Sequence, residues 1–323
     1  MTKFEEQIPA VSFKVLSGPR SNTAYRDELK RLASACSTWG FVYLVDLDRE
    51  ELYKTMFEQA KAFFSLSQSS KDALTRNREG NSNRYRGFFP VDDGSNSFKE
   101  GFEAGWQGYE PTGSGYVFDE LSVFPAETEL PGFRAFLDTY FESHLVVGRV
   151  MLAAFEDYFG LVPGYFNERF GNTLSTLRLL HYPGLSQMKD QSNLERDEES
   201  GILFTTPTHT DSGIITLLLQ DNTGGLQVLN GEGQWSDARV IEGSLVMNIG
   251  DLLTRWTGGE FKATRHRIKA PAGSRYSVPF FFEPEGKALI EPFKEGSSFQ
   301  PVSYEAYLNE KFQEFVEYRN LAV

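Results

Sequence analysis

The stretch Leu226-Gln227-Val228-Leu229-Asn230-Gly231-Glu232-Gly233-Gln234-Trp235, residues 226–235, carries the pattern that decides the fold. Asn230-Gly231 separates two runs of strand-like residues, and this dipeptide is typical of the turn in a β-hairpin. Similar short runs of β-branched and aromatic residues, broken by turns, fill residues 173–283. Many short strands at close spacing favour a β-sandwich or barrel over a sheet that alternates strands with helices.

The flanking sequence predicts helices on both sides of this β region. Apolar residues at helical spacing predict helices at 23–38, 49–66, 131–159 and 303–319, with Val146 on the buried side of the third. Short strands are expected at 41–45 and around 98–106. Residues 185–202 are polar and charged, which is typical of a lid or a disordered insertion. We expect one domain, 1–323, with an N-terminal α/β portion (1–170), a β core (171–285) and a C-terminal helical segment (286–323).

The composition restricts the class of partner. The 323-residue chain has a formal net charge of −13 and no long basic run, so nucleic acid and anionic membranes are poor partners, and a small molecule is the better candidate. No obligate protein partner is evident. The single cysteine, Cys36, excludes an intrachain disulfide or a cysteine-based metal cluster, and we interpret it as ordinary packing. No apolar run is long enough to span a bilayer and the first residues lack a signal-peptide pattern, so a cytoplasmic protein is expected.

A candidate metal site comes from the four histidines. His209-Thr210-Asp211 places an imidazole and a carboxylate two residues apart, and on a strand both side chains point to the same face. A second predicted strand, 261–268, carries His266. Two imidazoles and one carboxylate suit Fe(II), because the opposite coordination positions stay open for a cosubstrate and O2. The alternative is that His209 and His266 are hydrogen-bonded core residues. His181 is expected to pack or to support the site, and His144 to be structural or exposed.

A candidate anion site follows nine residues after His266. Arg275-Tyr276-Ser277-Val278-Pro279-Phe280-Phe281 predicts a strand with Arg275, Ser277, Pro279 and Phe281 on one face. A buried arginine is costly unless it meets an anion, and a guanidinium is shaped to bind a carboxylate with two hydrogen bonds. The segment 177–183 likewise places Arg178, Leu180 and Tyr182 on one face.

Together these segments resemble a known family. The set His209-Thr210-Asp211, His266 and Arg275-x-Ser277 resembles the isopenicillin N synthase-like branch of the 2-oxoglutarate/Fe(II) dioxygenases. Similar landmarks run through nearly the whole chain: Leu179-Leu180-His181-Tyr182-Pro183, Gly224-Gly225-Leu226-Gln227-Val228, Asn248-Ile249-Gly250-Asp251, Gly40-Phe41-Val42-Tyr43 and Lys99-Glu100-Gly101-Phe102-Glu103. The segments look most like those of fungal thymine hydroxylase-type members. Those members carry an aromatic residue directly after the triad aspartate, where this chain has Ser212, which argues against a stacked pyrimidine substrate.

The resemblance implies a distorted double-stranded β-helix, or jelly roll, as the catalytic core. It implies iron held by His209, Asp211 and His266, and 2-oxoglutarate held by Arg275, Ser277 and Tyr182. The enzyme would consume O2, release succinate and CO2, and oxidise a small metabolite, in keeping with secondary metabolism. Two alternatives stay open: an Fe(II) oxidase of the same fold that does not use 2-oxoglutarate, and a catalytically silent binding protein.

The expected substrate pocket combines apolar walls with one or two cations. Its candidate residues are Arg178, Phe281, Arg86, Phe88 and Leu226. The aromatic and basic stretch 84–89 is expected to fold over the mouth, with 185–202 as a lid. Such a pocket suits a small aromatic or heterocyclic molecule with an acidic or carbonyl oxygen. The alternative is that Arg178 pairs with a buried acid from the N-terminal region and that the aromatic residues are core.

Overall fold

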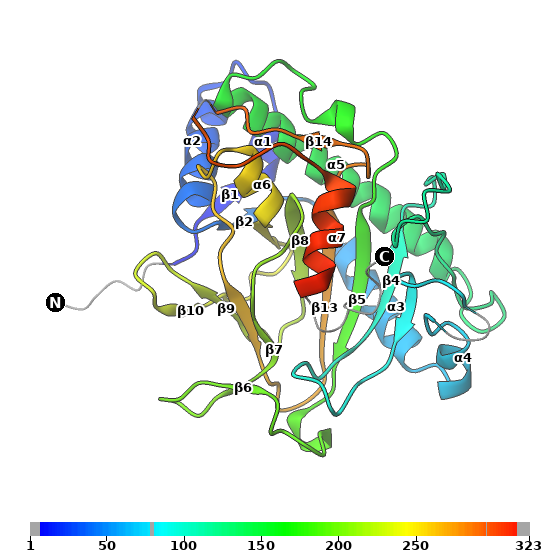
Figure 1. The fold of residues 1–323 in the computed structure, drawn as a ribbon. Coiled ribbons are helices and arrows are strands. Elements are labelled where there is room, and N and C mark those ends of the chain that lie inside the picture. The colour runs from blue at the N-terminus through cyan, green and yellow to red at the C-terminus, as the bar shows by residue number, and fades with distance from the viewer. Residues whose placement is uncertain (1–6, 78–80, 295, 315–323) are drawn as a thin grey trace.

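The computed structural model describes residues 7–77, 81–294 and 296–314. Two β-sheets face each other (Figure 1), one with eight strands in the order β1-β2-β11-β8-β13-β5-β4-β3 and one with five in the order β10-β9-β12-β7-β6. This is the expected distorted jelly roll, mostly β with flanking helices. The strands of the large sheet are β1 (Ala10–Ser12), β2 (Phe41–Val45), β3 (Gly87–Phe89), β4 (Glu100–Gly105), β5 (Thr176–Tyr182), β8 (Ile215–Gln220), β11 (Leu245–Ile249) and β13 (Arg275–Phe282). Those of the small sheet are β6 (Glu195–Arg196), β7 (Leu203–His209), β9 (Leu226–Leu229), β10 (Trp235–Asp237) and β12 (His266–Lys269).

The N-terminal portion builds part of the large sheet. Helix α2 (Thr23–Thr38) ends just before Gly40, and β2 then pairs with β11 of the catalytic core. Gly40 has φ +66°, and a Cβ there would lie 2.1 Å from the carbonyl oxygen of Lys262. Only glycine fits this turn. Strands β1 to β4 therefore extend the sheet across the boundary expected at residue 170.

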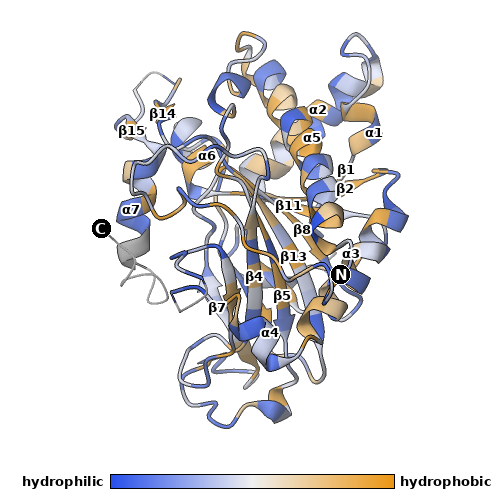
Figure 2. Cartoon of the chain, turned by 90° about the vertical axis from the view of Figure 1, so that its right-hand side faces the viewer, coloured by the Kyte–Doolittle hydropathy of each residue, from blue (hydrophilic) through white to orange (hydrophobic). Residues whose placement is uncertain are grey.

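Helices cover the outer face of the large sheet. Helices α3 (Glu50–Phe64) and α5 (Phe133–Phe159) pack against β13, and Figure 2 shows α2, α3 and α5 on the same side of that sheet. Gly148 of α5 lies against the ring of Phe282, where a Cβ would come within 2.7 Å of ring carbons. The expectation that Val146 is buried is wrong, because it is 52% exposed and lies on the opposite side of the helix from Gly148. His144 is fully buried, with Nδ1 hydrogen-bonded to the carbonyl of Tyr140.

Several local expectations are met. The hairpin β9–β10 turns at Asn230, whose side-chain oxygen accepts from the backbone of Glu232 and Gln234. Cys36 is buried in the core. Helix α7 (Tyr304–Glu314) closes the described chain, and residues 315–319 of the expected helix lie outside the described residues. No helix in these ranges combines the length and apolar character needed to cross a membrane.

Three local expectations are corrected. The strand expected at 261–268 begins only at His266, because residues 262–265 run without regular structure to bring that side chain in line with β7. The stretch 84–89 was expected to fold over the mouth, but residues 84–86 form bends and residues 87–89 form β3, an edge strand paired with β4. Residues 185–202 are ordered: they contain the 3₁₀ turn η2 (Leu185–Gln187) and β6, which pairs with β7.

Candidate active site

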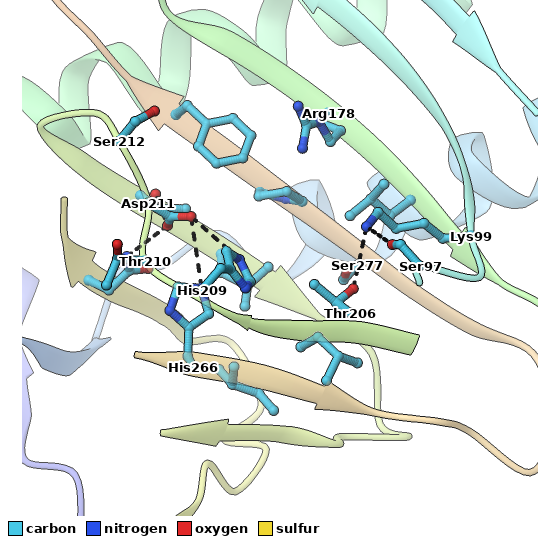
Figure 3. A pocket seen from close by; sticks show the side chains of 18 of the residues that line it. Ser97, Lys99, Arg178, Thr206, His209, Thr210, Asp211, Ser212, His266 and Ser277 are labelled. Atoms are coloured by element: carbon cyan, nitrogen blue, oxygen red, sulfur yellow. Dashed lines mark hydrogen bonds and ion pairs between the residues drawn. The ribbon is translucent and has the colours of Figure 1, made fainter. Parts of the chain in front are cut away.

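One cavity of about 370 Å³ lies between the two sheets. The inner faces of β5, β8 and β13 line it from the large sheet, and those of β7, β9 and β12 line it from the small sheet. Leu308 of α7 adds an apolar contact from the C-terminal segment. Figure 3 shows polar side chains from both sheets pointing into this space.

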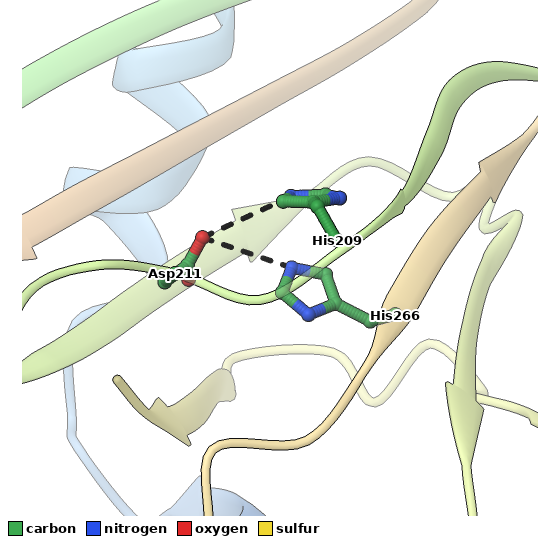
Figure 4. Close-up of side chains that lie close together, drawn as sticks. All are labelled: His209, Asp211 and His266. Atoms are coloured by element: carbon green, nitrogen blue, oxygen red, sulfur yellow. Dashed lines mark ion pairs between the residues drawn. The ribbon is translucent and has the colours of Figure 1, made fainter. Parts of the chain in front are cut away.

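His209, Asp211 and His266 come together on one wall of the cavity (Figure 4). His209 ends β7 and His266 begins β12, and the two are register partners across the antiparallel pair. One ligand atom from each residue lies within 4.8 Å of the others. Asp211 Oδ1 is 3.8 Å from the Nε2 atom of each histidine. This is the only cluster of this kind among the described residues.

The hydrogen bonds around the cluster orient it for a metal. The Nδ1 atoms of His209 and His266 bond to the carbonyls of Pro207 and Thr264, at 2.8 and 3.1 Å, so both Nε2 lone pairs can face the cluster. Thr216 and Asn248 donate to Asp211 Oδ2 at 2.5 and 2.8 Å, which leaves Oδ1 directed at the histidines.

The charge of the cluster also suits a divalent cation. Burial, followed by the neighbouring His266, lowers the pKa of His209 to about 4, so its imidazole is neutral near pH 7. Burial alone would raise the pKa of Asp211, but His266, His209 and the two hydrogen bonds hold it below its usual value. Two imidazole nitrogens and one carboxylate on one side of a point form the donor set that fits Fe(II).

A buried cation lies at one end of the cavity. Arg275 is fully buried, and its Nε donates to the carbonyl of Gly224 at 2.5 Å. Its Nη1 and Nη2 atoms have no hydrogen-bond partner among the described residues. The Tyr182 ring lies 4.9 Å from the guanidinium carbon, and Ser277 is on the same face of β13. Burial lowers the pKa of Arg275, and two unpaired N–H donors in such a place suit a carboxylate.

Sequence reasoning missed two charged residues of this cavity, Lys99 and Glu283. The Lys99 ammonium contacts the hydroxyl of Ser97 and lies 3.5 Å from that of Thr206 (Figure 3). The Thr206 hydroxyl is in turn 3.2 Å from the hydroxyl of Tyr182. Residues 96–99 have no regular structure, so no periodicity could assign a face to Lys99. Glu283 continues the period-two face of β13 beyond Phe281, and extending that pattern by one step would have found it.

Arg178 lines the cavity and is also paired with an acid. Its Nε donates to Glu103 at 2.5 Å and its Nη2 to the Tyr85 hydroxyl at 3.0 Å. Glu103 on β4 is fully buried and also pairs with Arg76. This contact agrees with the alternative given in the sequence analysis, in which Arg178 pairs with a buried acid from the N-terminal region. Its guanidinium nevertheless lies 4.9 Å from the centre of the Phe281 ring, within the cavity wall.

The remaining substrate candidates divide into two groups. Leu226 and Phe281 line the cavity. Arg86 and Phe88 do not, so their expected place at its mouth is wrong: Arg86 is buried against Thr176, with an Nη1–Oγ1 distance of 2.6 Å, and Phe88 is fully buried in the main core. Tyr85, the residue before Arg86, does line the cavity.

Two further elements lie outside this cavity. No residue of 185–202 lines it, so nothing in the structure assigns a lid role to that segment. His181 points away from the cavity, as expected, and its Nδ1 lies 2.8 Å from Glu100.

Comparison with known proteins places this geometry in a family. Residues 175–284 match the model of the 2OG-Fe(II) oxygenase superfamily. Residues 8–126 match that of the non-haem dioxygenase in morphine synthesis N-terminal region. The two matches cover the strands and loops that carry the metal cluster, Arg275 and Lys99.

Individual relatives agree along most of the chain. A 2-oxoglutarate-dependent dioxygenase of Glarea lozoyensis is 29% identical over 310 residues, covering 88% of this chain and 90% of its own. A 2-oxoglutarate-Fe(II) type oxidoreductase of Emericella nidulans is 32% identical over 245 residues, covering 72% and 66%. Among solved structures, a full-length Neurospora crassa protein in complex with alpha-KG and thymine superposes with a TM-score of 0.81 at 27% identity, covering 95% and 97%.

Proposed function

This chain belongs to the 2OG-Fe(II) oxygenase superfamily and is an Fe(II)- and 2-oxoglutarate-dependent dioxygenase, and from that premise we propose that it oxidises a small aromatic or heterocyclic metabolite inside the cavity described above. One observation carries the proposal: a single cavity contains both the candidate iron ligands His209, Asp211 and His266 and the buried Arg275, whose Nη atoms have no hydrogen-bond partner among the described residues.

In this proposal His209, Asp211 and His266 hold the iron. Their three donor atoms lie on one wall, so an iron held by them would be accessible to cosubstrate and O2 from the cavity. The hydrogen bonds from Thr216 and Asn248 keep the carboxylate of Asp211 in its ligating orientation.

Arg275, Ser277 and Tyr182 hold the distal carboxylate of 2-oxoglutarate. The two unpartnered Nη atoms of Arg275 supply two charge-assisted hydrogen bonds, and the hydroxyls of Ser277 and Tyr182 supply further donors. Fe(II) with 2-oxoglutarate and O2 supplies the oxidising chemistry, with succinate and CO2 as co-products. The protein orients the reactants and keeps water away with the apolar walls formed by Leu226, Phe281 and neighbouring side chains.

The cavity favours a small substrate with a flat apolar surface. Phe281 offers an aromatic face, with the guanidinium of Arg178 beside it as a donor for a carbonyl or acidic oxygen. The Neurospora crassa protein, at 27% identity, carries thymine and alpha-KG, which supports a heterocyclic ligand of this size. A volume of about 370 Å³ lies at the small end for ligand sites, so it suits a single- or double-ring metabolite.

The test is turnover of 2-oxoglutarate by purified protein in air with Fe(II) and ascorbate. We expect slow succinate release without substrate and faster release when a matching aromatic or heterocyclic metabolite is added. Oxidation of a metabolite without any 2-oxoglutarate requirement would indicate the oxidase alternative. An absence of both succinate and oxidised product would indicate a silent binding protein.

A further inference from the structure

Glu283 is a buried acid in the cavity wall that the proposed chemistry does not use. It follows β13 directly, is only 6% exposed and lines the cavity. Every second residue from Ser277 onward faces inward and lines the cavity: Ser277, Pro279, Phe281 and Glu283. Arg275 and Glu283 are eight residues apart, at about 3.3 Å per residue, so their Cα atoms lie roughly 26 Å apart along the chain, at opposite ends of the site.

The surrounding structure holds Glu283 firmly in place. Its carbonyl oxygen accepts hydrogen bonds from the hydroxyls of Thr173 and Ser175, at 2.5 and 3.2 Å, and its N–H donates to Ser175 Oγ at 2.9 Å. Its carboxylate lies against the backbone of Gly213, where a Cβ would come within 2.8 Å of Oε1. Gly213 is two residues beyond Asp211, so the acid is located at the metal end of the substrate space.

The carboxylate is poorly satisfied by the protein. It forms no ion pair with any residue in the described ranges. The hydroxyl of Tyr304, with Arg86 and Arg178 at longer range, acts to lower the pKa of Glu283, but burial outweighs them and raises it to about 7. A carboxyl group has several acceptor positions, and burying it with those positions unsatisfied costs free energy. A buried titratable group that faces a cavity in this way is a candidate ligand contact.

Arg178 lines the same cavity and, unlike Glu283, is a cation that donates hydrogen bonds. It is held by Glu103 on one side and packs on Phe281 on the other, so its position is set before any ligand binds. The cavity therefore presents a hydrogen-bond donor, an aromatic face and an acceptor. A ligand that matches all three is flat and has both an oxygen acceptor and a proton to donate.

We propose that Glu283 accepts a hydrogen bond from an N–H group of the substrate while Arg178 donates to a carbonyl or carboxylate oxygen of the same molecule. The substrate class is thus a planar nitrogen compound of the ring-amide or aromatic N–H carboxylate type. This inference rests on the proposed function, because it places the substrate in the same cavity.

The test compares matched probes on protein loaded with Mn(II) and N-oxalylglycine, a non-reacting mimic of 2-oxoglutarate, so that binding is measured without turnover. The pairs are 2-pyridone with 2-pyrone, thymine with 1,3-dimethylthymine, and indole-2-carboxylate with benzofuran-2-carboxylate. By calorimetry, we expect the N–H member of at least one pair to bind wild type tenfold or more tightly than its partner. Glu283→Leu should reduce that ratio to about one, whereas Glu283→Gln, which keeps an amide oxygen acceptor, should retain part of it.

Glu285→Gln is the matched control, because Glu285 lies two residues further on and lines a different cavity. Equal binding of both members of every pair, failure of all N–H probes to bind, or a ratio that survives in Glu283→Leu would overturn the proposal. So would a melting temperature of unliganded Glu283→Gln well below that of Glu285→Gln, because Glu283 would then be structural. Failure of the proposed function itself appears separately, as an absence of 2-oxoglutarate-dependent succinate release.

Discussion

Replacement of Arg275 by leucine distinguishes between two roles for this side chain, binding of an anion and stabilisation of the fold. The side chain is fully buried, and its Nε donates a hydrogen bond to the Gly224 carbonyl. Nη1 and Nη2 are left for a ligand. Leucine fills much of the same space but removes the charge and both donors.

The expected loss can be estimated from that geometry. Removing one partner of a buried, hydrogen-bonded charge pair costs about 3 kcal/mol, because the remaining carboxylate is then buried unpaired. At about 1.4 kcal/mol per tenfold change, the Kd for 2-oxoglutarate should rise by roughly 100-fold. The stability of the unliganded protein should stay the same or increase slightly, since the substitution removes two unsatisfied donors and a buried charge.

Both quantities can be measured on one preparation. Calorimetry with Mn(II)-loaded protein gives the Kd for 2-oxoglutarate, and chemical denaturation without ligand gives the free energy of unfolding. Arg267→Leu is the matched control: Arg267 lies between the rings of Phe204 and Trp235, at 3.8 and 3.9 Å, and pairs with Glu195 and Asp197. That variant should lose about 2 kcal/mol of stability, less than a fully buried pair because its partners are partly exposed. An unchanged Kd in Arg275→Leu, or a stability loss as large as that of Arg267→Leu, would refute the reasoning.

Four further outcomes follow from the same site. His266→Ala should abolish both iron binding, measured by metal analysis, and succinate release; iron content equal to wild type would contradict the proposed ligand set. Lys99→Met should raise the Kd for 2-oxoglutarate about tenfold, because its ammonium adds positive charge beside Thr206 and Tyr182; an unchanged Kd would exclude this role. Arg178→Ala and Phe281→Ala should lose substrate-coupled succinate release while keeping much of the uncoupled release, and equal loss of both would make them structural. Burial raises the pKa of Glu283 to about 7 from a usual 4.5, so the free energy of unfolding of wild type falls as pH rises through this range. The free energy of unfolding of Glu283→Gln, measured by denaturation, should equal that of wild type near pH 4 and exceed it at pH 8 by up to roughly 3 kcal/mol. A difference that does not change with pH would contradict the raised pKa.

The sequence alone carried most of the fold and the chemistry-bearing motifs. Helix 23–38 and strand 41–45 match the structure residue for residue, because each has a local signal: apolar spacing ended by a glycine, then a short β-branched and aromatic run. The spacing that places Arg275 and Ser277 on one face of β13 could be predicted for the same reason. His209 and Asp211 come together as predicted, but β7 ends at His209 and Asp211 lies two residues beyond the strand. A strand alternates its faces with a period of two, so neighbours in sequence report neighbours in space.

The tertiary structure alone decided which charged groups meet. Glu103 and Arg178 are far apart in sequence, and only the pairing of β4 with β5 brings them together, which is why the partner of Arg178 could not be named from its own strand. Lys99 enters the cavity from a segment without periodicity, and Arg86 and Phe88 leave it because β3 joins the sheet edge instead of folding over the mouth. Local sequence determines the face of an element, whereas the contacts between elements depend on sheet order and packing over long separations, which no local pattern encodes.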